Sequence, residues 1–115
     1  MKKFLTSFSY AFKGLSYAYR TQLNFKIHVF AAIVISCLGY VYNISNQEWL
    51  WIILAIALVL ISELFNTALE TLVDLVSPVY QNKAGIVKDV AAAAVLIMAC
   101  LAVAIGLIVF IPKIF

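Results

Sequence analysis

The sequence predicts an all-α membrane protein with an N-terminal amphipathic surface helix and three transmembrane helices. Of its 115 residues, 66% are hydrophobic and 11% are charged, and the mean hydropathy is +1.09. A typical soluble domain is about 45–50% apolar and about 25% charged. A chain this small cannot bury so much apolar surface in its own core, so lipid must cover much of it. Its length suits a single domain, residues 1–115.

The surface helix is expected over residues 4–20, where apolar and aromatic residues recur at helical spacing. The apolar face consists of Phe4, Leu5, Phe8, Ala11, Phe12, Leu15, Ala18 and Tyr19. Lysine, arginine and serine fill most of the other face. A basic amphipathic helix of this kind suits a membrane surface. The alternative is a soluble helix that packs against a partner.

The three transmembrane helices are expected over residues 23–42, 49–75 and 86–111. Each stretch supplies the roughly 20 mostly apolar residues that a span requires. Pro78 should end the second helix just before it. Lysine and arginine gather before the first span and in the second connection, which predicts that both are cytoplasmic. These basic residues are scattered, so they do not form a nucleic-acid footprint.

A stripe of polar residues marks the second span: Glu63, Asn66, Glu70 and Asp74. Their spacing of three, four and four residues places them on one helix face. Helical rise puts Glu63 about 21 Å from Trp49, which is still within the apolar zone. A carboxylate inside a membrane is costly and by default indicates function.

The polar residues around the stripe favour phosphate chemistry. Lys88 and Asp89 begin the third span at the same membrane face. Carboxylates with a lysine suit a magnesium-bound nucleotide, and a buried glutamate suits a general base that takes a proton from an alcohol. Two alternatives stay open: polar groups that pair between helices, and a stripe that lines the pathway of a small oligomeric transporter.

Other reactive side chains give weaker signals. His28, near the start of the first span, is interpreted as a hydrogen-bonded interfacial residue. Cys37 and Cys100 lie in apolar runs without metal or redox spacing, and we interpret them as packing residues.

The stripe also carries a family resemblance. Residues 63–74, Glu-Leu-Phe-Asn-Thr-Ala-Leu-Glu-Thr-Leu-Val-Asp, resemble the signature of the prokaryotic diacylglycerol kinase family, which includes undecaprenol kinases. The resemblance extends to Asn24-Phe-Lys-Ile-His28, to Lys88-Asp89 and to the alanine run at residues 91–94.

This resemblance implies a homotrimer in the bacterial inner membrane, with active sites shared between subunits at the cytoplasmic interface. Such enzymes transfer the γ-phosphate of ATP to a lipid alcohol with Mg²⁺ and without a Walker-type loop. The acceptor would be undecaprenol or diacylglycerol, with a slight preference for undecaprenol from the short chain and the position of His28. A degenerate, non-catalytic relative is the alternative within the family.

The resemblance also assigns roles to residues. Glu63 would be the general base, Asn66 would orient substrate or phosphate, and Glu70 would hold the metal. The residues expected to contact ATP are Lys3, Tyr10, Gln22, Glu70, Lys88 and Asp89.

One position departs from the family pattern. Gln22 stands where relatives usually have a second metal-binding glutamate. An amide oxygen can ligate Mg²⁺ but brings no charge. We therefore expect weaker metal binding, or a metal shell completed by Asp89, Asp74 or water.

Overall fold

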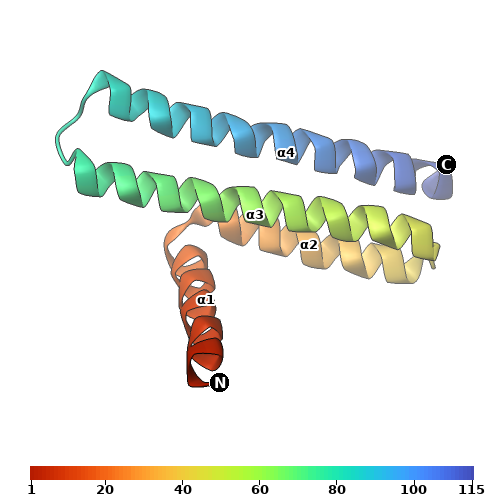
Figure 1. Ribbon diagram of the computed structural model, residues 1–115. Helices are drawn as coiled ribbons and strands as arrows, with labels where there is room; N and C mark the ends of the chain where they lie inside the picture. The colour runs from red at the N-terminus through yellow and green to blue at the C-terminus, as the bar shows by residue number, and fades with distance from the viewer.

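The computed structural model describes all 115 residues and contains four helices and no strands. The helices are α1 (Lys2–Thr21), α2 (Leu23–Val41), α3 (Asn46–Val76) and α4 (Asn82–Ile114). Helices α2, α3 and α4 lie lengthwise beside one another, and α1 projects steeply away from them (Figure 1). Each of the three bundled helices is long and apolar enough to cross a membrane. The predicted all-α membrane fold is confirmed.

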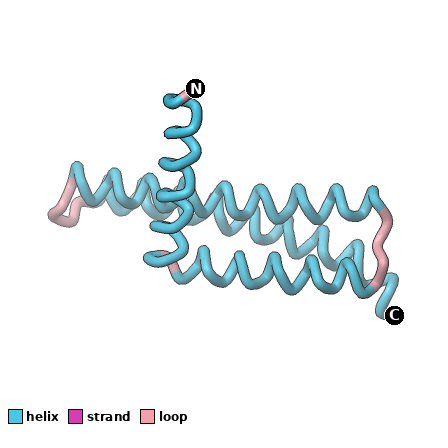
Figure 2. Tube along the Cα trace, turned by 90° about the horizontal axis from the view of Figure 1, so that it is seen from below, coloured by secondary structure: helices cyan, strands magenta, loops and turns pink.

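The helix ends follow from local chemistry. Ser45 caps α3 by accepting a hydrogen bond from the Glu48 backbone N–H at 3.2 Å, and the Glu48 side chain accepts one from the Ser45 N–H at 2.9 Å. This reciprocal capping box satisfies two donors that the helix cannot satisfy itself. At the other end α3 stops at Val76, two residues before Pro78, as predicted. The α2–α3 and α3–α4 connections are short, and within the bundle α3 runs antiparallel to α2 and to α4 (Figure 2).

A buried apolar cluster lies at the end of the bundle that holds the α2–α3 connection. It consists of Ile44, Ile52, Val109 and Phe110. Lys113 at the end of α4 pairs with Glu48 at the start of α3, with Nζ 3.1 Å from Oε2. This end of the bundle is therefore closed by apolar packing and an ion pair.

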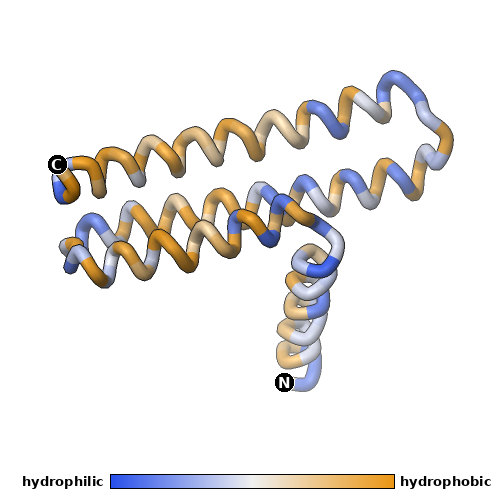
Figure 3. The backbone as a smooth tube through the Cα atoms, turned by 180° about the vertical axis from the view of Figure 1, so that it is seen from behind, coloured by the Kyte–Doolittle hydropathy of each residue, from blue (hydrophilic) through white to orange (hydrophobic).

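Most of the bundle surface is apolar. Only 14 of the 115 residues are buried, and many large hydrophobic side chains of α3 and α4 are exposed. Hydrophobic positions dominate most of the length of these two helices, whereas hydrophilic ones gather toward the α3–α4 connection (Figure 3). In water this surface would be unfavourable to expose. Lipid or partner helices must cover it, as the composition requires.

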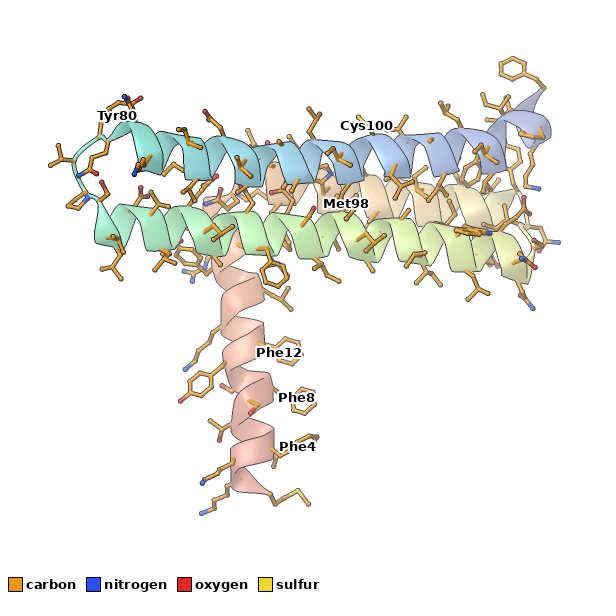
Figure 4. All side chains as sticks on the ribbon, turned by 45° about the horizontal axis from the view of Figure 1, so that its top comes forward. Phe4, Phe8, Phe12, Tyr80, Met98 and Cys100 are labelled. Carbon is orange, nitrogen blue, oxygen red and sulfur yellow. The ribbon has the colours of Figure 1, made fainter.

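Helix α1 is attached to the bundle at its C-terminal end, where Ala18 is buried. Phe4, Phe8 and Phe12 project from one side of the helix (Figure 4). The rings of Phe4 and Phe8 meet edge to face, with centroids 5.1 Å apart. A row of aromatic side chains on a basic helix is suited to the boundary between lipid and water.

Candidate active site

Helix α3 carries the polar stripe from the bundle interior to its exposed end. Glu63 is 2% exposed and Asn66 is 8% exposed. One turn further along the helix Glu70 is half-buried, and Asp74 is exposed. Solvent exposure therefore increases along the stripe, from the buried carboxylate of Glu63 to the exposed carboxylate of Asp74.

Glu63 faces α2, where it meets the single histidine of the chain. The Nε2 atom of His28 lies 3.2 Å from Oε1 of Glu63. That oxygen is buried and accepts no aligned hydrogen bond. Thr67 donates its hydroxyl to the main-chain oxygen of Glu63 at 2.9 Å, so it leaves the carboxylate free. A buried carboxylate with an unsatisfied oxygen needs a donor from a partner or ligand.

Asn66 and Glu70 form the second part of the site. The Nδ2 group of Asn66 donates to Oε1 of Glu70 at 3.0 Å. This bond fixes the amide so that its Oδ1 atom remains as a buried acceptor without a partner. Such an acceptor can orient the O–H of an alcohol or bind a cation.

Lys88 on α4 reaches the outer end of the stripe. Its Nζ lies 2.6 Å from Oδ1 of Asp74, and both side chains are substantially exposed. Asp89, the next residue, is exposed. The α3–α4 hairpin thus places one cation next to the acidic stripe where solutes in water can reach it.

Gln22 links α1 to α2 and is half-buried. It precedes His28 by six residues, and Glu70 follows Glu63 by seven. Because α2 and α3 run antiparallel, helical rise puts Gln22 about 9 Å and Glu70 about 10.5 Å from the histidine contact, toward the same end of the bundle. The two proposed metal ligands therefore lie at a similar depth.

The two predicted nucleotide contacts on α1 lie elsewhere. Lys3 and Tyr10 are exposed on the part of α1 that projects from the bundle (Figure 1). The Tyr10 ring packs under Lys13, with Nζ 5.5 Å from its centroid. A single chain does not bring them to the stripe, whereas it does bring His28 to Glu63 and Lys88 to Asp74.

The polar residues present fit a magnesium ion, although no group of three or more His, Cys, Asp or Glu side chains is placed to hold a metal by itself. Magnesium typically takes one or two carboxylates and completes its shell with water and phosphate oxygens. The Glu70 carboxylate and the side-chain oxygen of Gln22, both half-buried and at a similar depth, are hard oxygen donors of the required kind.

Two contacts are not specified by the sequence. The expected role of His28, a hydrogen-bonded interfacial residue, does not identify Glu63 as its partner, and the expected position of Lys88 at the same membrane face as the stripe does not identify Asp74 as its partner. The second contact has a local signal, because Pro78 forces a hairpin that places the end of α3 beside the start of α4. Nothing in the sequence fixes the rotation of α2 that turns His28 toward Glu63.

Comparison with known proteins identifies the family. The sequence model described as "Prokaryotic diacylglycerol kinase" matches residues 9–110. The undecaprenol kinase of Bacillus subtilis (strain 168) is 37% identical over 113 residues, which cover 98% of this chain and 92% of that protein. The diacylglycerol kinase of Synechocystis is 42% identical over 109 residues, covering 94% of this chain and 62% of that longer protein. The diacylglycerol kinase of Escherichia coli (strain K12) is 35% identical over 97 residues, covering 82% and 77%. The chain therefore belongs to the prokaryotic diacylglycerol kinase family and is a lipid kinase.

Proposed function

We propose that this protein transfers the γ-phosphate of ATP to the hydroxyl of a membrane lipid alcohol, with Mg²⁺, at the cytoplasmic face of the bacterial inner membrane. One observation carries the proposal. The carboxylate of Glu63 is buried and lies one turn from the unpartnered Oδ1 of Asn66. A buried carboxylate and an unpartnered amide oxygen on one helix face suit a lipid hydroxyl that donates its proton.

Proton transfer comes first in the proposed chemistry. The Glu63 carboxylate takes the hydroxyl proton, while Oδ1 of Asn66 orients the alcohol. The alcohol oxygen forms a bond to the γ-phosphorus, the bond between that phosphorus and the β,γ-bridging oxygen breaks, and ADP leaves with the released electron pair. Positioning and charge stabilisation account for most of the catalysis in phosphoryl transfer.

The exposed end of the stripe would hold the nucleotide. Lys88 exchanges Asp74 for a phosphate oxygen, which its exposed position permits. Glu70, with Gln22 at a similar depth on the neighbouring helix, would hold Mg²⁺, which neutralises charge on the phosphates when bound. The exposed Asp89 would be a further oxygen donor.

The predicted nucleotide contacts on α1 require a second subunit. Because Lys3 and Tyr10 project away from their own stripe, we propose that they contact the nucleotide of a neighbouring subunit in a homotrimer. Partner helices would also cover part of the apolar outer surface of α3 and α4.

The proposed orientation follows the charges. Lys2, Lys3, Lys13 and Arg20 lie on α1, and Lys83 and Lys88 follow α3, whereas the α2–α3 connection has no lysine or arginine. This distribution favours a cytoplasmic N-terminus and a cytoplasmic α3–α4 connection. Both would lie on the side where ATP is available.

Among lipid alcohols, we propose undecaprenol as the principal acceptor. The relative named undecaprenol kinase aligns over nearly its whole length as well as that of this chain. Diacylglycerol, the substrate in the name of other relatives, offers a similar primary hydroxyl and is the competing acceptor.

A transporter receives no comparable support, because the polar stripe does not cross the membrane. It begins at the exposed end and stops at Glu63, beyond which α3 is apolar apart from Ser62 up to Trp49. The closed cluster around Ile52 occupies the far end.

The test is phosphate transfer by purified protein in mixed micelles. Radiolabelled ATP is supplied with Mg²⁺ and either undecaprenol or diacylglycerol. We expect label in the lipid fraction, faster with undecaprenol. If neither lipid becomes labelled or stimulates ATP consumption, the proposed function is wrong.

A further inference from the structure

We propose that His28 is a positioning residue for the general base, and that its imidazole N–H holds one oxygen of Glu63 so that the other faces the lipid hydroxyl. This inference rests on the proposed role of Glu63. His28 has no other role in the proposed phosphate transfer.

The contact between His28 and Glu63 joins α2 to α3 at a point where the Glu63 carboxylate is shielded from solvent. His28 comes from the second turn of α2, and its Nε2 is 3.2 Å from Oε1 of Glu63. No other cationic or imidazole side chain lies within ion-pair distance of this carboxylate. The neighbouring polar side chains are committed elsewhere: Asn66 to Glu70, and Thr67 to a main-chain oxygen.

The surroundings leave the imidazole few alternatives. His28 is the polar residue at the edge of an apolar cavity of about 100 Å³ between the three bundled helices. The cavity wall is formed largely by small and aliphatic residues, among them Ala31, Ala32, Ala55 and Val59. The side chain of His28 is 24% exposed, against 2% for Glu63. The carboxylate is thus the principal polar partner available inside the bundle.

The distance and the lack of alignment suit a contact that tightens with substrate. Nε2 and Oε1 are close, yet Oε1 accepts no aligned hydrogen bond. Catalytic hydrogen bonds are often poorly aligned without substrate and improve in the complex. Nε2 can carry a proton in both the neutral and the charged imidazole, so it can act as a donor to Oε1 in either form. Oε2 is then the oxygen that accepts the alcohol proton.

A purely structural role is the rival explanation, since polar contacts also join membrane helices. The two explanations differ in what they predict for kinetics. A positioning role lowers kcat with the KM values for lipid and ATP unchanged, because the bond matters while the proton moves. A structural role lowers thermal stability and the amount of active protein, and its effect persists without Glu63.

The experiment compares two substitutions of His28 in the full-length protein. In His28→Gln the side-chain amide nitrogen can occupy the place of Nε2 and donate to Glu63, whereas His28→Leu offers no donor. We expect His28→Leu to lower kcat about 10- to 150-fold, the range for loss of a hydrogen bond to a charged group. His28→Gln should recover most of that loss. Cys37→Leu, an exposed position further along α2, is the control and should keep wild-type kcat.

A double-mutant cycle then separates the inference from the function on which it rests. If His28 acts through Glu63, His28→Leu should cause no further loss in a Glu63→Gln background. Additive losses, or a wild-type kcat for His28→Leu, would overturn the positioning role and leave the kinase function intact. If Glu63→Gln itself kept full activity, the proposed base would be wrong instead.

Discussion

Replacing Lys88 and Asp74 one at a time distinguishes a structural role of their ion pair from a catalytic role of the lysine. The two side chains are 41% and 67% exposed, although their charged atoms are only 2.6 Å apart. An ion pair this exposed contributes little to the free energy of unfolding, because water screens it. Breaking it should therefore have little effect on thermal unfolding, whichever partner is replaced.

Catalysis should respond to the two partners very differently. Lys88→Met removes a charged contact to phosphate. Loss of such a contact should lower kcat/KM for ATP about 10- to 150-fold. Asp74→Asn breaks the same pair but keeps the lysine and removes a competitor for it. Its kcat/KM for ATP should stay within about fivefold of wild type, the range of an exposed pair.

The assay is lipid phosphorylation at varied ATP concentration and saturating lipid, with thermal unfolding of the same preparations in detergent. Equal losses of activity in Lys88→Met and Asp74→Asn would refute this reasoning, because they would show that the pair matters as a link between α3 and α4. A Lys88→Met protein with wild-type kcat/KM for ATP would remove this lysine from the nucleotide site.

Two further substitutions test other parts of the structure. Gln22→Glu adds a carboxylate at the depth of Glu70 and should lower the half-saturating Mg²⁺ concentration about tenfold, equivalent to 1.4 kcal/mol; an unchanged Mg²⁺ dependence would exclude Gln22 from the metal shell. Gly39→Ala would place its Cβ 2.7 Å from the Trp49 ring and 3.1 Å from Ile44, and such overpacking costs about 1–3 kcal/mol. In Gly106→Ala the Cβ meets no atom within 4 Å, so this matched control should be neutral or more stable by up to about 1 kcal/mol from helix propensity. Unfolding temperatures in detergent compare the two, and a Gly39→Ala protein as stable as Gly106→Ala would contradict the close packing of Trp49.

The helices could be predicted from the sequence because their signals are local. Apolar runs of about 20 residues specify membrane spans regardless of how the helices pack. Pro78 marks the end of α3 because its ring restricts the preceding backbone. The arc of Glu63, Asn66 and Glu70 follows from helical periodicity alone.

The contacts between helices could not be predicted in the same way. The approach of His28 to Glu63 depends on the rotation and axial shift of α2 against α3, which the sequence of neither helix determines alone. The same holds for Gly39, where the absence of a side chain gives the Trp49 ring its place. The projection of α1, which carries Lys3 and Tyr10 away from the stripe, depends on the backbone at Gln22, which is extended between two helices.

Glu63→Gln tests the general base directly, since it changes one atom of the carboxylate and preserves its size. Phosphate transfer to lipid should fall about 100- to 10,000-fold, the usual contribution of a general base, with little change in thermal unfolding. The matched control is Glu48→Gln at the opposite end of the same helix, where the carboxylate caps α3 and pairs with Lys113. This control should unfold at a lower temperature and keep its phosphate-transfer rate. Wild-type transfer by the Glu63→Gln protein, or an equal loss in the Glu48→Gln protein, would contradict the assignment of Glu63 as the base.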